Sequence, residues 1–228
     1  MNPCTSFNRT SISVVLLDVC DTLVLFNTAD QYVHYILNHA LINRKKYVPW
    51  IRFINRLSIP HKLGLRHKLL LLSLLRGMKE TDLDTLAAAY CQEVLAQNLN
   101  QKVIQLLHQL RQQNPDLQVL LISGGYEIYL RHLARLKEIQ ACAVIGNQLL
   151  FKKGVFTGFM QLPECMQEYK VIRLKQTGWL ARMQPEHTAV ISDSFTDLPL
   201  FSLATHKYVT RPDTRLKQLV GCQFESLD

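Results

Sequence analysis

The sequence predicts an α/β fold, in which helices wrap a parallel sheet and a long helical segment is inserted into the core. Short apolar runs alternate with helical patterns along most of the chain, the order that produces parallel sheets. The segment 31–113 reads as almost wholly helical. Polar residues directly follow several of the strands. A chain of 228 residues suits one core domain that carries a modest insertion.

The first predicted strand, Ser13–Leu17, is a continuous apolar run of the kind buried on both faces of a sheet. Asp18 follows at its carboxyl end. In segment 31–113 apolar residues recur at spacings of three and four, which is typical of helices packed against a core. Helix-breaking residues divide this segment near Pro49, Pro60–His61 and Gly77.

The second half of the chain predicts four further strands and a hairpin. The strands are expected at Leu117–Ile122, Ala141–Ile145, Thr188–Ile191 and Lys207–Thr210. Segment 148–159 reads as a small hairpin that turns at Gly154. Helices are expected at Glu127–Lys137 and Glu168–Thr177.

Three polar residues stand at predicted strand ends: Asp18, Ser123 and Asp193. Functional residues of parallel sheets gather beyond the carboxyl ends of the strands, so we expect these side chains to lie together. An aspartate that attacks a phosphate needs a divalent metal and a cation to neutralise the charges. Asp193 and Asp197 can supply the metal site, and Lys170 can supply the cation. Taken singly, each of these residues could equally be a helix cap, a turn former or an exposed side chain.

Four segments in this order resemble the motifs of the haloacid dehalogenase superfamily. They are Asp18-Val-Cys-Asp-Thr-Leu23, Ser123-Gly-Gly125, Lys170 and Ser192-Asp-Ser-Phe-Thr-Asp197. Segments 149–158 and 209–216 resemble the hairpin and the terminal strand and helix of its phosphoserine-phosphatase-like branch. The resemblance implies a Rossmann-like doubly wound core at 1–28 and 114–228, with an all-helical cap inserted at 29–113.

The resemblance also implies a role for each matched residue. Asp18 attacks phosphorus and forms an aspartyl phosphate, and its other oxygen binds Mg²⁺ together with the backbone carbonyl of Cys20. Asp193 completes the protein ligands, and Asp197 holds a metal-bound water or orients Lys170. Lys170 neutralises Asp18 and the phosphate. The remaining phosphate contacts are expected from Ser123 and from the backbone N–H groups of Gly124 and Asp21.

Cys20 departs from the family pattern, which places a second aspartate there as general acid and base. A thiol has a reference pKa near 8.5 and donates hydrogen bonds weakly, so it substitutes poorly. The neighbouring Asp21 stands where the family often has glycine, and its carboxylate is an alternative acid. Three outcomes of this replacement stay open: slow hydrolysis, hydrolysis of a substrate whose leaving group needs no acid, and phosphate binding with little turnover.

Basic residues exceed acidic ones, which gives a formal charge of +8, and they concentrate between Arg44 and Arg76. This asymmetry favours an anionic ligand, although such residues also solvate helix surfaces. Within a cap, some could bind a second anionic group of a small phosphorylated substrate. Nucleic acid is a weaker alternative, since Tyr47, Trp50 and Phe53 lie among the basic residues without a known binding motif. Contact of a basic helix around Leu69–Leu75 with a membrane surface is weaker still.

The six cysteines are widely spread, without a pair or a Cys/His set at zinc spacing, which favours a reducing compartment. The apolar run at Val14–Leu17 is too short for a signal peptide, and we expect a cytoplasmic protein.

Two hypotheses follow from the sequence. The first is a Mg²⁺-dependent phosphohydrolase or phosphotransferase; the second is a non-hydrolytic phospholigand-binding or partner-binding protein on the same scaffold. The oligomeric state is not predicted.

Overall fold

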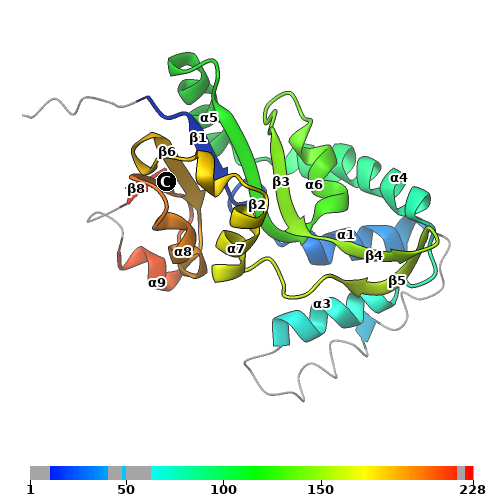
Figure 1. Cartoon of the computed structure of the whole chain (residues 1–228). Helices are drawn as coiled ribbons and strands as arrows, with labels where there is room; N and C mark the ends of the chain where they lie inside the picture. Colours follow the sequence, from blue (N-terminus) through cyan, green and yellow to red (C-terminus); the bar gives the residue numbers. More distant parts are fainter. Residues whose placement is uncertain (1–10, 41–47, 50–62, 220–223, 228) are drawn as a thin grey trace, which may run out of the picture.

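A six-stranded parallel sheet forms the centre of the computed structural model, which describes residues 11–40, 48–49, 63–219 and 224–227. Its strand order is β3-β2-β1-β6-β7-β8, so β1 is interior (Figure 1). The strands are β1 (Val14–Leu17), β2 (Gln118–Tyr126), β3 (Ala143–Asn147), β6 (Thr188–Ser192), β7 (His206–Val209) and β8 (Glu225–Ser226). The predicted parallel α/β architecture is confirmed.

Helices separate the strands along the chain. Those between β1 and β2 are α1 (Thr28–His39), α3 (Leu63–Ser73), α4 (Glu80–Tyr90) and α5 (Gln101–Gln113), and a π-helix at Cys91–Leu95 prolongs α4. The later helices are α6 (Glu127–Ala134), α7 (Glu168–Gln176), α8 (Leu198–Phe201) and α9 (Thr214–Lys217). In the part of the chain that the structure describes, no helix is long and apolar enough to cross a membrane.

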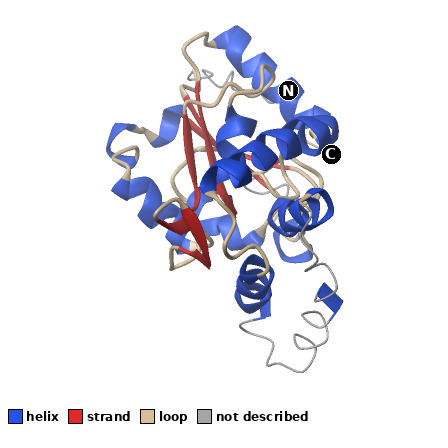
Figure 2. Cartoon of the chain, turned by 90° about the vertical axis from the view of Figure 1, so that its right-hand side faces the viewer, coloured by secondary structure: helices blue, strands red, loops and turns tan. Residues whose placement is uncertain are grey.

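Side chains of β1 alternate between two apolar cores, one on each face of the sheet. Val15 and Leu17 belong to the core that includes buried residues of α1, α5 and α6. Val14 and Leu16 belong to the core shared with α7, α8 and α9. Strand side chains point alternately to opposite faces, so a central strand covered on both sides must be apolar throughout. Figure 2 shows helices on both faces of the sheet.

The described elements between β1 and β2 are helical, as predicted. The break at Gly77 is confirmed: the residue has φ +90°, and the chain leaves α3 shortly before it. Pro60–His61 lies outside the described residues. The predicted hairpin forms from β4 (Leu149–Lys152) and β5 (Val155–Met160), and α3 packs against β5 beside α1 (Figure 1). The boundaries of core and cap stay a prediction.

The register of the central strands aligns their carboxyl ends. Leu17 pairs with Leu121 on one side and with Ile191 on the other. The next residue, Asp18, donates its backbone N–H to the carbonyl of Ile191 over 3.0 Å. Asp18, Ser123 in the last part of β2 and Ser192 at the end of β6 therefore reach the same edge of the sheet.

Candidate active site

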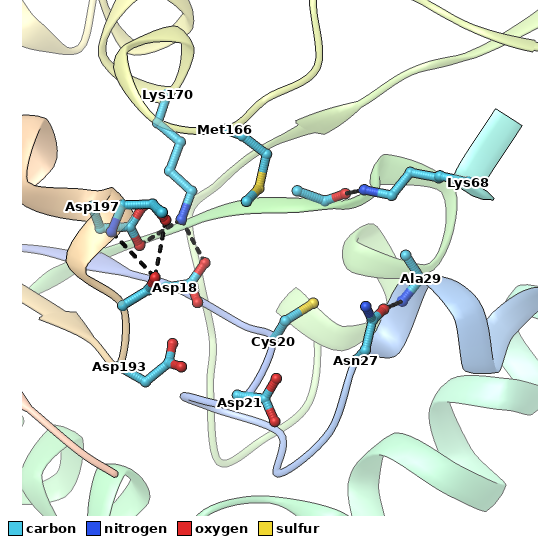
Figure 3. A pocket seen from close by; sticks show the side chains of 13 residues that line it. Asp18, Cys20, Asp21, Asn27, Ala29, Lys68, Met166, Lys170, Asp193 and Asp197 are labelled. Atoms are coloured by element: carbon cyan, nitrogen blue, oxygen red, sulfur yellow. Dashed lines mark hydrogen bonds and ion pairs between the residues drawn. The ribbon is translucent and has the colours of Figure 1, made fainter. Parts of the chain in front are cut away.

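Asp18 and Lys170 form a buried ion pair at this edge. The Nζ atom of Lys170, on α7, lies 2.7 Å from Oδ1 of Asp18 and 2.7 Å from Oδ2 of Asp197. Asp18 is 5% exposed, Lys170 2% and Asp197 1%, so all three residues lie almost entirely out of water. Ser192 donates its hydroxyl to the same Asp197 oxygen over 2.6 Å. Figure 3 shows Lys170 reaching down between the two carboxylates.

Burial and charge set the ionisation of this pair. Burial raises the pKa of Asp18 to about 6, against the lowering effect of Lys170. Burial opposes the charged form of Lys170, but the two carboxylates outweigh it and raise the pKa of the ammonium above its ordinary value. At neutral pH the lysine is protonated and Asp18 is mostly ionised. A carboxylate in this state is a competent nucleophile.

Asp193 stands on the other side of Asp18. Thr22 connects them: its hydroxyl lies 2.9 Å from Oδ1 of Asp193 and 3.2 Å from Oδ2 of Asp18. Burial, followed by the negative charge of Asp18, raises the pKa of Asp193 to about 7. The charge of Asp18 thus disfavours ionisation of Asp193, as expected for like charges in a shared site.

These residues fit a divalent cation. The site holds three carboxylates, those of Asp18, Asp193 and Asp197, and the ammonium of Lys170. Full ionisation of the three carboxylates therefore leaves two negative charges that this ammonium does not neutralise. The Oδ1 atom of Asp197 is buried and has no hydrogen-bond partner. Among the described residues no three His, Cys, Asp or Glu side chains form a complete metal cluster. Mg²⁺ needs no such cluster, because it is commonly held by one or two carboxylates, water and substrate phosphate.

The Ser123–Gly125 segment of β2 packs closely against its neighbours. Ser123 is fully buried and its Oγ accepts the N–H of Gly125 over 3.1 Å. A Cβ atom at Gly124 would lie 2.5 Å from Sδ of Met166, and one at Gly125 would collide with the hydroxyl of Tyr129. Gly125 is required by this close approach because Tyr129 is fully buried, whereas the exposed Met166 side chain has room to move away from Gly124.

A pocket of about 210 Å³ brings most of the predicted residues together. Asp18, Cys20, Asp21, Gly124, Lys170, Asp193 and Asp197 all line it. Ser123 lies behind this lining, with its Oγ 3.9 Å from Sγ of Cys20. Asp21 has φ +57°, the left-handed conformation that glycine adopts without strain. This agrees with its place in a position where the family often has glycine.

The pocket also contains residues that the sequence did not single out as site residues. They are Asn27, Ala29, Lys68, Met166, Ser194 and Thr196. Lys68, on α3, donates to the carbonyl of Gly124 over 2.9 Å and pairs with Glu164. It was visible in the sequence only as one member of the basic segment. Arg44, Lys45, Lys46, Arg52, Arg56 and Lys62, and the aromatic residues between them, lie outside the described residues.

A family model for haloacid dehalogenase-like hydrolases matches residues 15–202, which contain every residue of this site. The chain belongs to the haloacid dehalogenase-like hydrolases. The family inferred from the sequence motifs is thereby confirmed. No curated protein sequence matches the chain.

Several solved structures share the fold of this chain. A protein of unknown function from Bordetella pertussis Tohama I has a TM-score of 0.76 at 18% identity, over 96% of this chain and 100% of that one. A substrate-bound phosphoserine phosphatase has a TM-score of 0.60 at 17% identity, over 91% and 90%. Cytosolic 5'-nucleotidase IIIB bound to cytidine has a TM-score of 0.62 at 15% identity, over 95% and 81%.

Within this hydrolase site, the thiol of Cys20 points away from the ion pair. Its Sγ lies 3.0 Å from Oγ1 of Thr28, which in turn lies 2.7 Å from the hydroxyl of Tyr129. Burial, followed by the charge of Asp18, raises the pKa of the thiol above its ordinary value. Cys20 is therefore protonated at neutral pH, and a neutral thiol cannot accept a proton from water.

Proposed function

We propose that this hydrolase is a Mg²⁺-dependent phosphohydrolase that acts on small phosphorylated compounds through an aspartyl phosphate on Asp18. One observation carries the proposal: a nearly buried, mostly ionised Asp18 is held by Lys170 at the wall of a small pocket beside a second carboxylate. The names of two structural neighbours, a phosphoserine phosphatase and a 5'-nucleotidase, support phosphomonoesters as the substrate class.

The first step is attack of an Asp18 carboxylate oxygen on phosphorus. A bond forms between that oxygen and phosphorus, and the bond to the leaving group breaks. Lys170 keeps Asp18 ionised and faces the charge of the incoming phosphate. The N–H groups of Gly124 and Asp21 and the hydroxyl of Ser123 are the proposed donors to the phosphate oxygens. Asp18, Asp193 and the Cys20 carbonyl would hold Mg²⁺, which neutralises phosphate charge.

The second step returns the enzyme to its starting state. Water attacks the phosphorus, inorganic phosphate leaves, and the carboxylate of Asp18 is restored. No carboxylate stands at position 20 to protonate the leaving group or to accept the proton of the water. Loss of a positioned acid or base commonly slows a reaction by about a hundredfold to ten thousandfold. Turnover is therefore slow, unless the leaving group needs no acid.

Lys68 is the proposed contact for a second anionic group of the substrate. It projects from α3 toward the pocket, and its side chain is 12% exposed. Its ammonium contacts the Gly124 carbonyl and Glu164 and lies at the side of the pocket away from Asp18 and Lys170 (Figure 3). A carboxylate or phosphate on the leaving group would complete the hydrogen bonding of this ammonium.

Four described cysteines are free thiols, which supports a place in the reducing cytoplasm.

Phosphate release from a panel of phosphorylated metabolites tests the proposal. We expect release that depends on Mg²⁺ and that is lost in Asp18→Asn, with Asp116→Asn on a distant turn as the matched control. Equal release by wild type and Asp18→Asn would overturn the mechanism.

A non-hydrolytic phospholigand-binding role is the alternative that Cys20 favours. Phosphate binding without release of product from any panel member, together with no gain from Cys20→Asp, would favour that alternative.

A further inference from the structure

Asp213 lies outside the four motif segments that carry the site residues, within the terminal segment 209–216, but it contacts the loop that carries two of the site carboxylates. This loop, residues 193–197, connects β6 to α8 and includes a 3₁₀ turn at Phe195–Asp197. Asp213 stands at the start of α9, in a different part of the chain. Its backbone N–H donates to the carbonyl of Asp193 over 2.8 Å.

The carboxylate of Asp213 divides its two oxygens between two tasks. Oδ2 accepts the backbone N–H of Phe195 over 2.6 Å and the hydroxyl of Ser194 over 3.2 Å. Oδ1 accepts the N–H groups of Arg215 and Leu216 over 2.9 and 2.8 Å, which caps α9. These bonds outweigh partial burial and lower the pKa of Asp213 below its ordinary value, so the group is ionised at neutral pH.

The loop needs such an anchor because its middle is only half-buried. Asp197, at its far end, is buried against Lys170, whereas residues 193–196 are partly exposed. Ser194 binds Ser192 and Thr196, which are its own neighbours in the chain. Asp213 adds a charged acceptor from another element, and Arg215 lies over the ring of Phe195 at 6.0 Å.

We infer that Asp213 is a positioning residue that fixes the 193–197 loop, and thereby Asp193, for binding of the divalent cation. The inference rests on the proposed function, since it concerns the same metal site. Groups that orient metal ligands commonly change metal affinity by about tenfold to a hundredfold when they are replaced.

Two substitutions separate the helix cap from the loop contact. Serine caps helices about as well as aspartate but offers a single oxygen, so Asp213→Ser keeps the α9 cap and loses the bond to Phe195. Asp213→Ala loses both. Asn114→Ala serves as a control that removes side-chain hydrogen bonds to Asp116 and Ile12 at a remote turn.

The experiment is Mn²⁺ binding to the full chain, followed by the electron paramagnetic resonance signal of the free ion. We expect Kd to rise by about tenfold or more in both Asp213 variants and to stay unchanged in Asn114→Ala. The rise should persist at high salt, because a merely electrostatic effect of the lost charge would be screened there. The melting temperature of each variant shows whether it is folded.

The outcomes distinguish the inference from the proposed function. Wild-type affinity in Asp213→Ser, with weaker binding only in Asp213→Ala, would show that the residue merely caps α9 and would overturn the inference. An effect that disappears at high salt would overturn it as well. Failure of the wild type itself to bind Mn²⁺ would overturn the proposed function, and the inference with it.

Discussion

Replacing Lys170 by methionine should destabilise the protein in a pH-dependent manner. The ammonium makes two bonds of 2.7 Å to Asp18 and Asp197, and all three groups are nearly inaccessible to water. Methionine fills similar volume but leaves two buried carboxylates without their cation. Breaking a buried pair in this way costs about 3 to 5 kcal/mol of unfolding free energy.

The sign of the pH dependence follows from Asp18. Its pKa is already raised to about 6, and Lys170 is the neighbour that lowers it, so the variant raises it further. At pH values between the pKa of Asp18 in the unfolded chain and its raised pKa in the native protein, the native state binds more protons than the unfolded state. Stability therefore falls as pH rises through this range. The loss should therefore be larger at pH 8 than at pH 5.

Urea unfolding of wild type and Lys170→Met at both pH values measures this loss. Lys175→Met, at an exposed position of the same helix, is the control and should change stability little. A loss below about 1 kcal/mol, or the same loss at both pH values, would refute the reasoning from buried charge.

Three further predictions concern the metal, the acid position and the cap. Without metal, the raised pKa values of Asp18 (about 6) and Asp193 (about 7) should make the free energy of unfolding fall by a few kcal/mol as pH rises from about 4 to 8. Urea unfolding in EDTA measures this fall. The same dependence of unfolding free energy on pH in Asp193→Asn would contradict the prediction. Cys20→Asp should raise the rate of phosphate release by about a hundredfold or more, measured with a phosphomonoester that has a poor leaving group; an unchanged rate would mean that no acid is missing. Lys68→Met should raise KM by about tenfold, and only for substrates with a second anionic group. Lys79→Met, at an exposed position, is the control. An equal rise in KM for all substrates would contradict the assigned contact.

The central strand and the motif residues were predictable because their environment is encoded locally. β1 is buried on both faces, so its apolar run is continuous and ends at a polar residue. The four motif segments stand in a fixed order, and parallel topology brings their strand ends together. Asp18, Ser123 and Asp193 were therefore expected near one another, and the family resemblance added Lys170. The structure brings Asp18, Lys170 and Asp193 together at one pocket.

Other features depend on packing between distant segments. β2 continues to Tyr126, beyond the predicted end at Ile122, because Tyr126 pairs with Asn147 after an irregularity in the register. β8 has only two residues, too few for a sequence pattern. Lys68 enters the site because α3 packs beside the pocket, and no local signal distinguishes it from neighbouring basic residues.

Detection of a phosphoryl group on Asp18 tests the central claim most directly. Wild type and Asp18→Asn are mixed with substrate and Mg²⁺, quenched in acid within milliseconds to seconds, and analysed by peptide mass spectrometry. Because Cys20 cannot act as a base for water, hydrolysis of the aspartyl phosphate is slowed. With a phosphomonoester whose leaving group needs no acid, we predict that a phosphorylated peptide containing Asp18 accumulates in the wild type and is absent from the variant. Turnover without phosphorylation of Asp18, or with the phosphoryl group on another residue, would contradict the account.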